Sequence, residues 1–62
     1  MTTSDQFSLT LTLDNDAFQD NCPAEVARIL REAAAQIEEG DLTRGACRDA
    51  NGNTVGVWRF LY

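Results

Sequence analysis

The sequence predicts a small α+β fold with the order strand, helix, strand, strand, and three patterns carry that prediction. Apolar residues occupy every second position over residues 7–13, which is the period of a half-buried strand. They recur every three or four positions over residues 23–39, the period of a helix with one buried side. Two further apolar segments, 42–49 and 54–62, flank the Asn51-Gly52 pair that is typical of a β-hairpin turn.

The first strand leads into a polar loop over residues 14–21. Ala17 and Phe18 are the apolar exceptions, and we expect Phe18 to fold back over one end of the core. A chain of 62 residues buries a limited share of its surface, so residues 1–62 are expected to form one domain with a small core.

The helix is predicted to begin at Pro23, because proline favours the first helical position. Cys22 would then be the N-cap, with Asn21 or Asp20 sharing the role. Gly40 is the expected stop. The predicted buried stripe consists of Val26, Ile29, Leu30, Ala33 and Ile37.

Two arrangements of the strands satisfy the pattern. The first strand can pair antiparallel with the third, giving the order 1-3-2, or parallel with the second through a right-handed crossover. We favour a mainly antiparallel sheet of order 1-3-2, because it places the most apolar strand in the centre, with the helix packed on one face.

The third strand has one side that carries Arg59 and another that carries Trp58 and Phe60, so the aromatic side is expected to face the helix. Gly56 on that side would let the alanine-rich helix approach closely. The outer sheet face is then expected to hold Thr10, Thr12, Val55, Val57 and Leu61. This apolar face is a candidate contact surface, or it is simply a set of scattered surface hydrophobes.

Charge is the strongest functional signal. Ten Asp and Glu stand against five Arg, without Lys or His, and the formal net charge is −5 with a pI near 4.2. This balance disfavours direct binding of nucleic acid and favours a basic partner, including a protein that itself binds nucleic acid. The alternative is that the acidity only keeps a small protein in solution.

Several other classes are disfavoured by the sequence. It has no apolar run long enough to span a membrane and no basic-then-apolar leader at its start, so we expect a cytoplasmic protein with reduced thiols. Without His or Lys, no oriented base is available to a nucleophile, and we expect no enzyme activity. No cofactor and no metal site are predicted, since the Asp14-Asn15-Asp16 and Asp49–Asn53 segments each lack the ligands of a calcium loop. Cys22 and Cys47 fall near the same end of the fold and could pair under oxidation.

The acidic residues fall into two groups in this topology. One end carries Asp14, Asp16, Asp20, Glu25 and Asp49, and the other carries Asp5, Glu38, Glu39 and Asp41. Separated acidic groups on a rigid body can imitate a phosphate backbone. The predicted partner-binding residues are therefore Asp14, Asp16, Asp20, Glu25, Glu32 and Asp49. The competing interpretation is that the loop aspartates are turn and cap formers.

Three segments, 14–18, 25–31 and 49–56, read Asp-Asn-Asp-Ala-Phe, Glu-Val-Ala-Arg-Ile-Leu-Arg and Asp-Ala-Asn-Gly-Asn-Thr-Val-Gly. They resemble small proteins of phages, prophages and plasmids, and the chain is similar in size and charge to the acidic phage proteins that act as anti-CRISPR inhibitors. The resemblance implies a phage-encoded inhibitor of a type I CRISPR effector or a similar bacterial defence complex, working as a monomer or homodimer. It transfers no functional residue. The alternative is a small accessory or self-associating phage protein that uses its apolar sheet face.

Overall fold

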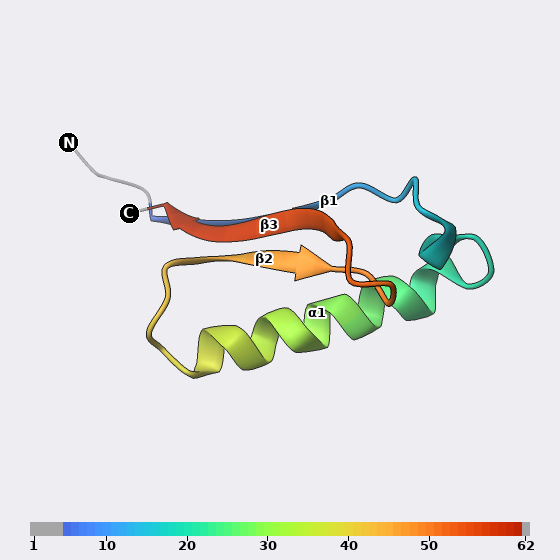
Figure 1. Ribbon diagram of the computed structural model, residues 1–62. Coiled ribbons are helices and arrows are strands. Elements are labelled where there is room, and N and C mark those ends of the chain that lie inside the picture. Colours follow the sequence, from blue (N-terminus) through green and yellow to red (C-terminus); the bar gives the residue numbers. More distant parts are fainter. Residues whose placement is uncertain (1–4, 62) are drawn as a thin grey trace.

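The computed structural model describes residues 5–61 and has the predicted order of elements (Figure 1). The elements are β1 (Gln6–Leu11), the short 3-10 helix η1 (Asp16–Phe18), α1 (Cys22–Glu38), β2 (Arg44–Arg48) and β3 (Thr54–Leu61). The strands form one antiparallel sheet of order β1-β3-β2, which confirms the predicted topology and excludes the parallel alternative. The two ends of the described chain pair with each other, since Gln6 lies opposite Leu61.

The helix begins one residue earlier than expected, and its cap is different. The Asn21 side chain accepts a hydrogen bond of 3.3 Å from the backbone N–H of Ala24, so Asn21 is the N-cap and Cys22 is already helical. The amide oxygen of asparagine is a good acceptor for these free N–H groups, whereas a thiol is a poor one. At the other end Gly40 adopts a left-handed φ of 81°, the conformation that ends many helices, as expected.

The core is built around Trp58, which is completely buried and faces the helix as predicted. Its indole N–H donates a 2.9 Å hydrogen bond to the Gln36 side chain of α1, so the one polar atom of the ring has a partner. Gly45 on β2 makes room for the ring, because a Cβ there would lie 2.6 Å from it. The other buried apolar residues are Phe18, Ile29, Ala33, Cys47 and Val55. Phe18 thus closes one end of the core, as predicted.

The helix does not lie under the middle of the sheet but closest to β2 (Figure 1). One of its flanks contacts β2, where the Arg28 side chain donates a 3.1 Å hydrogen bond to the Arg48 carbonyl. Leu30 lies on the opposite flank and is 46% exposed, so its predicted place in the buried stripe is wrong. Phe7 on β1 is also 46% exposed, because the helix leaves this side of the inner face partly open.

Val55 was expected on the outer face but is buried, with 6% of its surface exposed. The reason is a β-bulge. Arg48 of β2 pairs with Thr54 and the adjacent Cys47 pairs with Gly56, which leaves Val55 without a counterpart of its own. The extra residue shifts the alternation of side chains, so Val55 turns inward. Val57 beyond the bulge keeps its predicted outward direction and is 53% exposed.

Gly56 is needed for a different contact from the one expected. It lies opposite Leu11 of β1, and a Cβ there would collide with the carbonyl oxygen of Thr10. The close approach is therefore between β3 and β1 and does not involve the helix.

Two adjacent helix positions give a matched test of this packing. Ile29→Ala removes a side chain that is 1% exposed and should lower the free energy of unfolding by about 2–5 kcal/mol. Leu30→Ala should cost about 1 kcal/mol or less, because nearly half of that side chain is already in water. Urea unfolding followed by Trp58 fluorescence measures both. Equal losses would mean that Leu30 is buried as deeply as Ile29 and that the helix presents a different side to the sheet.

Candidate functional site

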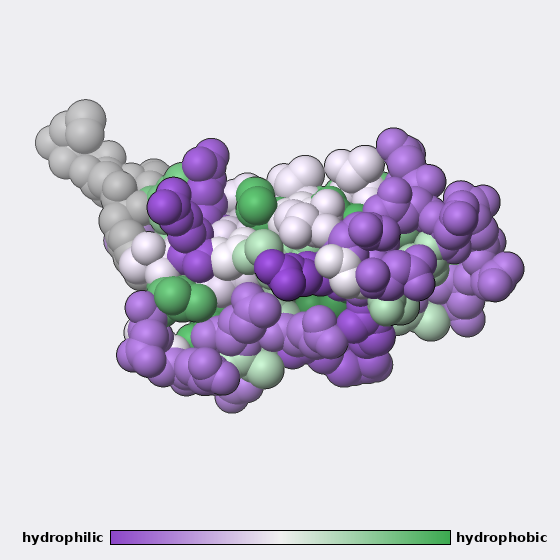
Figure 2. Space-filling view, in the orientation of Figure 1, coloured by the Kyte–Doolittle hydropathy of each residue, from purple (hydrophilic) through white to green (hydrophobic). Residues whose placement is uncertain are grey.

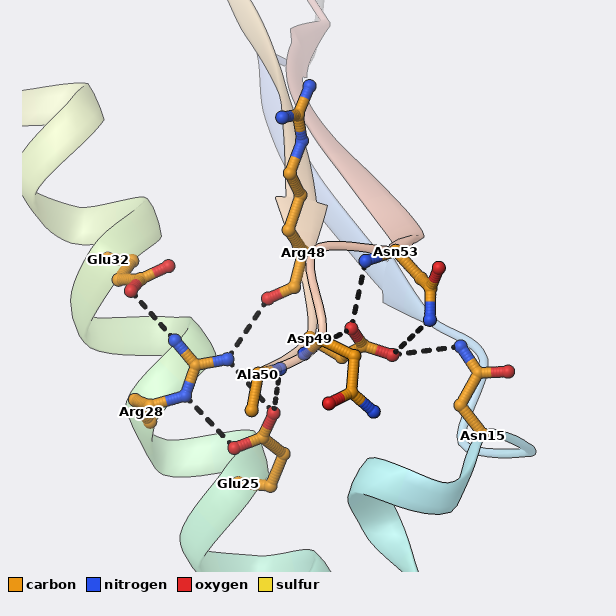
Figure 3. Close-up of polar contacts among 9 residues, drawn as sticks. Asn15, Glu25, Arg28, Glu32, Arg48, Asp49, Ala50 and Asn53 are labelled. Atoms are coloured by element: carbon orange, nitrogen blue, oxygen red, sulfur yellow. Dashed lines mark hydrogen bonds and ion pairs between the residues drawn. The ribbon is translucent and has the colours of Figure 1, made fainter.

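Polar side chains from three separate segments meet at the end of the molecule where η1 lies (Figure 3). They come from the β1–η1 loop, the first turns of α1 and the β2–β3 turn, and we call them the polar cluster: Asn15, Glu25, Arg28, Asp49 and Asn53. Hydrogen bonds between these three segments hold this end of the fold together.

Asp49 is the centre of the polar cluster and is 4% exposed. One carboxylate oxygen accepts 2.9 Å hydrogen bonds from the backbone N–H groups of Asn51 and Asn53, which is how an aspartate organises a tight turn. The other accepts from the side chains of Asn15, at 3.0 Å, and Asn53, at 3.3 Å. Burial alone would raise the pKa of Asp49. The hydrogen bonds outweigh that effect and hold the pKa below its ordinary value of 3.8.

Glu25 links the helix to the same turn. Its two carboxylate oxygens each accept a 2.9 Å hydrogen bond from Arg28, and one of them also accepts the backbone N–H of Ala50 at 2.8 Å. The side chain is 10% exposed. The hydrogen bond from Arg28 is the main reason that the pKa of Glu25 lies below its ordinary 4.5. Arg28 continues to Glu32 at 2.7 Å, so one guanidinium holds two carboxylates of α1.

The six predicted partner-binding residues therefore separate into two sets. Glu25 and Asp49 point inward and are saturated by donors, while Glu32 is 58% exposed but paired with Arg28. Asp14, Asp16 and Asp20 are exposed on the segment between β1 and α1. Of the six, only these last three are exposed and form no ion pair with an arginine within residues 5–61. We call them the loop acids.

The structure also assigns roles that the sequence did not suggest. Asn15 lies in the polar loop before α1, and its side chain binds a carboxylate 34 positions away in the sequence. No local signal predicts such a contact. Arg28 could have been found, because it lies three and four positions from Glu25 and Glu32, the spacing of helix ion pairs.

The remaining reactive groups are few. Cys22 and Cys47 are free thiols, and burial raises the pKa of the Cys47 thiol, which makes it a weaker nucleophile at neutral pH. Among residues 5–61, no three potential ligands of the Cys, Asp and Glu types come together as a metal site would require. No helix in that range is long and apolar enough to cross a membrane.

A shallow groove of about 400 Å³ runs between α1 and β2. Its walls mix charged and apolar side chains, namely Glu32, Gln36, Leu42 and Arg48, above the buried Ile29 and Cys47.

No family model matches the chain, and neither the curated proteins nor the solved structures include a match to it.

The polar cluster predicts a specific response to mutation and pH. Asp49→Asn replaces an acceptor by a group with two donors that would face the Asn15 and Asn53 amides, so it should destabilise the protein at pH 7. Asp14→Asn removes the same charge from an exposed position and serves as the control.

Because the folded-state pKa of Asp49 is lowered, its contribution is present above pH 3.8 and is lost as the pH falls through the folded pKa. The difference in unfolding free energy between the wild type and Asp49→Asn should therefore shrink below pH 4, measured by urea unfolding from pH 7 to pH 2. A difference that stays constant over this range would contradict the assigned charge state.

Proposed function

We propose that this chain is a non-enzymatic acidic inhibitor that binds a basic, nucleic-acid-handling surface of a bacterial defence complex. The resemblance of its sequence segments to small phage proteins supplies the target class, a type I CRISPR effector. The observation that carries the proposal is the division of the carboxylates into an inward set, which stabilises the fold, and an outward set that forms no ion pair with an arginine within residues 5–61.

The outward set lies mainly at the two ends of the molecule. Besides the loop acids, it comprises Asp5, Glu38, Glu39 and Asp41, all exposed. Hydrophilic side chains gather over the η1 end in the view of Figure 2. The 17 residues of α1 separate the two acidic ends by about 25 Å, at 1.5 Å per residue. The loop acids are therefore a separate negative group at one end of the molecule, and such a group suits a groove that binds phosphates.

The loop acids stand on an anchored segment. Asn15, between Asp14 and Asp16, is tied to Asp49 by a 3.0 Å hydrogen bond, and Phe18 is buried in the core with 4% exposure. A segment held at both of these points loses little conformational freedom when a partner binds it, which lowers the entropic cost of association. This supports a binding role for the loop acids and a positioning role for Asn15 and Asp49.

A second candidate rests on the outer sheet face. Val57 is 53% exposed there, beside Thr10 on the neighbouring strand, and no element of the described chain covers this face. A small accessory protein could use it as an apolar contact. The two proposals differ in which substitution abolishes partner binding.

The test compares two charge-neutralised variants with equal loss of charge. Asp14→Asn/Asp16→Asn/Asp20→Asn removes the loop acids, and Glu38→Gln/Glu39→Gln/Asp41→Asn removes three acids from the opposite end. Binding to a purified type I effector is measured by calorimetry at two salt concentrations, with competition by its nucleic acid. We expect the first variant to bind about 100-fold more weakly than the wild type, at about 1 kcal/mol per lost charge pair. The second variant should lose much less affinity than the first.

Wild-type binding should also weaken as salt rises, because exposed charge pairs are screened. The Val57→Glu variant should bind the effector as tightly as the wild type. Binding that survives high salt and the loop-acid substitutions but is lost in Val57→Glu would replace this proposal by the outer-face candidate. No binding to any such effector would leave neither the target class nor the inhibitor role standing.

A further inference from the structure

The two edge strands of the sheet, β1 and β2, differ in charge and in how well their open edges are protected. β2 carries Arg44 and Arg48, and its end is contacted by the helix through Arg28. β1 is the only one of the three described strands without a charged side chain, and it has neither a proline nor a bulge. Natural edge strands usually carry one of these devices, because an unprotected edge pairs with other strands.

The backbone of β1 leaves a regular row of hydrogen-bonding groups free. Thr12 donates its N–H to the Val55 carbonyl at 2.7 Å, so its backbone faces β3. Backbone groups of successive residues point to opposite edges of a strand. The N–H and C=O groups of Phe7, Leu9 and Leu11 therefore point to the open edge of the sheet.

The same side of the molecule is apolar on its inner face. Because α1 lies beneath β2, Phe7 and Leu30 are each 46% exposed. Leu13, just beyond the end of β1, is 42% exposed. The Phe7 ring contacts the rings of Trp58 and Phe60, with centroids 6.2 and 5.1 Å away, and nearly half of the residue stays exposed. A partner that paired with β1 would extend the sheet and cover this open flank.

We propose that β1 is a homodimer interface, in which a second copy pairs antiparallel with it about a two-fold axis at Leu9. Opposite residues of an antiparallel pair share a face. This register places Phe7 opposite Leu11 of the second copy, so the two half-open inner faces join. It also places Leu9 opposite Leu9 of the second copy, where their free backbone N–H and C=O groups can form a hydrogen-bonded pair.

The distribution of charge permits a second copy at this position. Two chains of net charge −5 repel each other unless their contact avoids the acids. In the Leu9-centred register, Asp5 falls beside Leu13 of the second copy, and no carboxylate of the described chain lies opposite another. Asp16, Asp20 and the groove between α1 and β2 remain outside the contact, and Asp14 lies at its rim. The proposal does not depend on the inhibitor function.

Two measurements on the wild-type chain test the interface. Sedimentation equilibrium from micromolar to millimolar concentration should show a monomer–dimer transition. Residue-resolved amide hydrogen exchange by NMR, at concentrations below and above that transition, should show protection of the Phe7, Leu9 and Leu11 amides in the dimer only. A monomer throughout, or a dimer in which these three amides still exchange freely, would overturn the proposal.

A variant pair separates the edge from the outer face. Ser8→Glu/Thr10→Glu places carboxylates opposite each other twice across the two-fold axis and should weaken dimerisation by at least about tenfold. Within one chain Ser8 lies opposite Arg59, so the first substitution is compatible with the fold. The control, Thr54→Glu/Val57→Glu, adds the same charge on β3 and should leave the dimer intact. Loss of the dimer in the control would assign the contact to the outer sheet face, on which Thr10 also lies, and refute the β1 interface.

Discussion

Burial of Trp58 is the constraint on which the rest of this small fold depends. The ring needs Gly45 on one side, because any larger residue would occupy its space, and Gln36 on the other, because its N–H requires an acceptor. Because the ring lies against Gly45 of β2 and its N–H bonds to Gln36 of α1, the helix is held close to β2. The helix then cannot also cover β1, and the exposed flank with Phe7 and Leu30 is the result.

The polar cluster joins the helix, the β1–η1 loop and the β2–β3 turn at the η1 end, as Trp58 joins the helix to the sheet in the core. A carboxylate with 4% exposure is costly unless donors surround it, and Asp49 receives them from the loop, from its own turn and from Asn53. Glu25 attaches the helix to the same turn through Ala50. Acidic residues that look alike in the sequence thus lie in different environments, and the number of hydrogen bonds that each accepts separates the structural ones from the exposed ones.

Much of the architecture followed from local patterns. Period two, period 3.6 and the Asn51-Gly52 turn predicted every strand and the helix in order, and the apolar third strand predicted the antiparallel topology. The misassigned residues depend on longer-range geometry. Leu30 is exposed because the helix is displaced sideways, and Val55 is buried because a bulge shifts its strand by one residue. The pairing of Asn15 with Asp49 joins segments that no periodicity connects.

The pairing of Gln6 with Leu61 has a consequence for how the chain acquires its structure. The β2–β3 hairpin closes over a short turn, and α1 needs only local contacts, so both can form early. β1 must wait for a strand that is nearly the whole chain away, and closing so long a loop is slow. During synthesis on the ribosome β1 is made first and completed last, so an uncharged strand remains without its partner until β3 emerges.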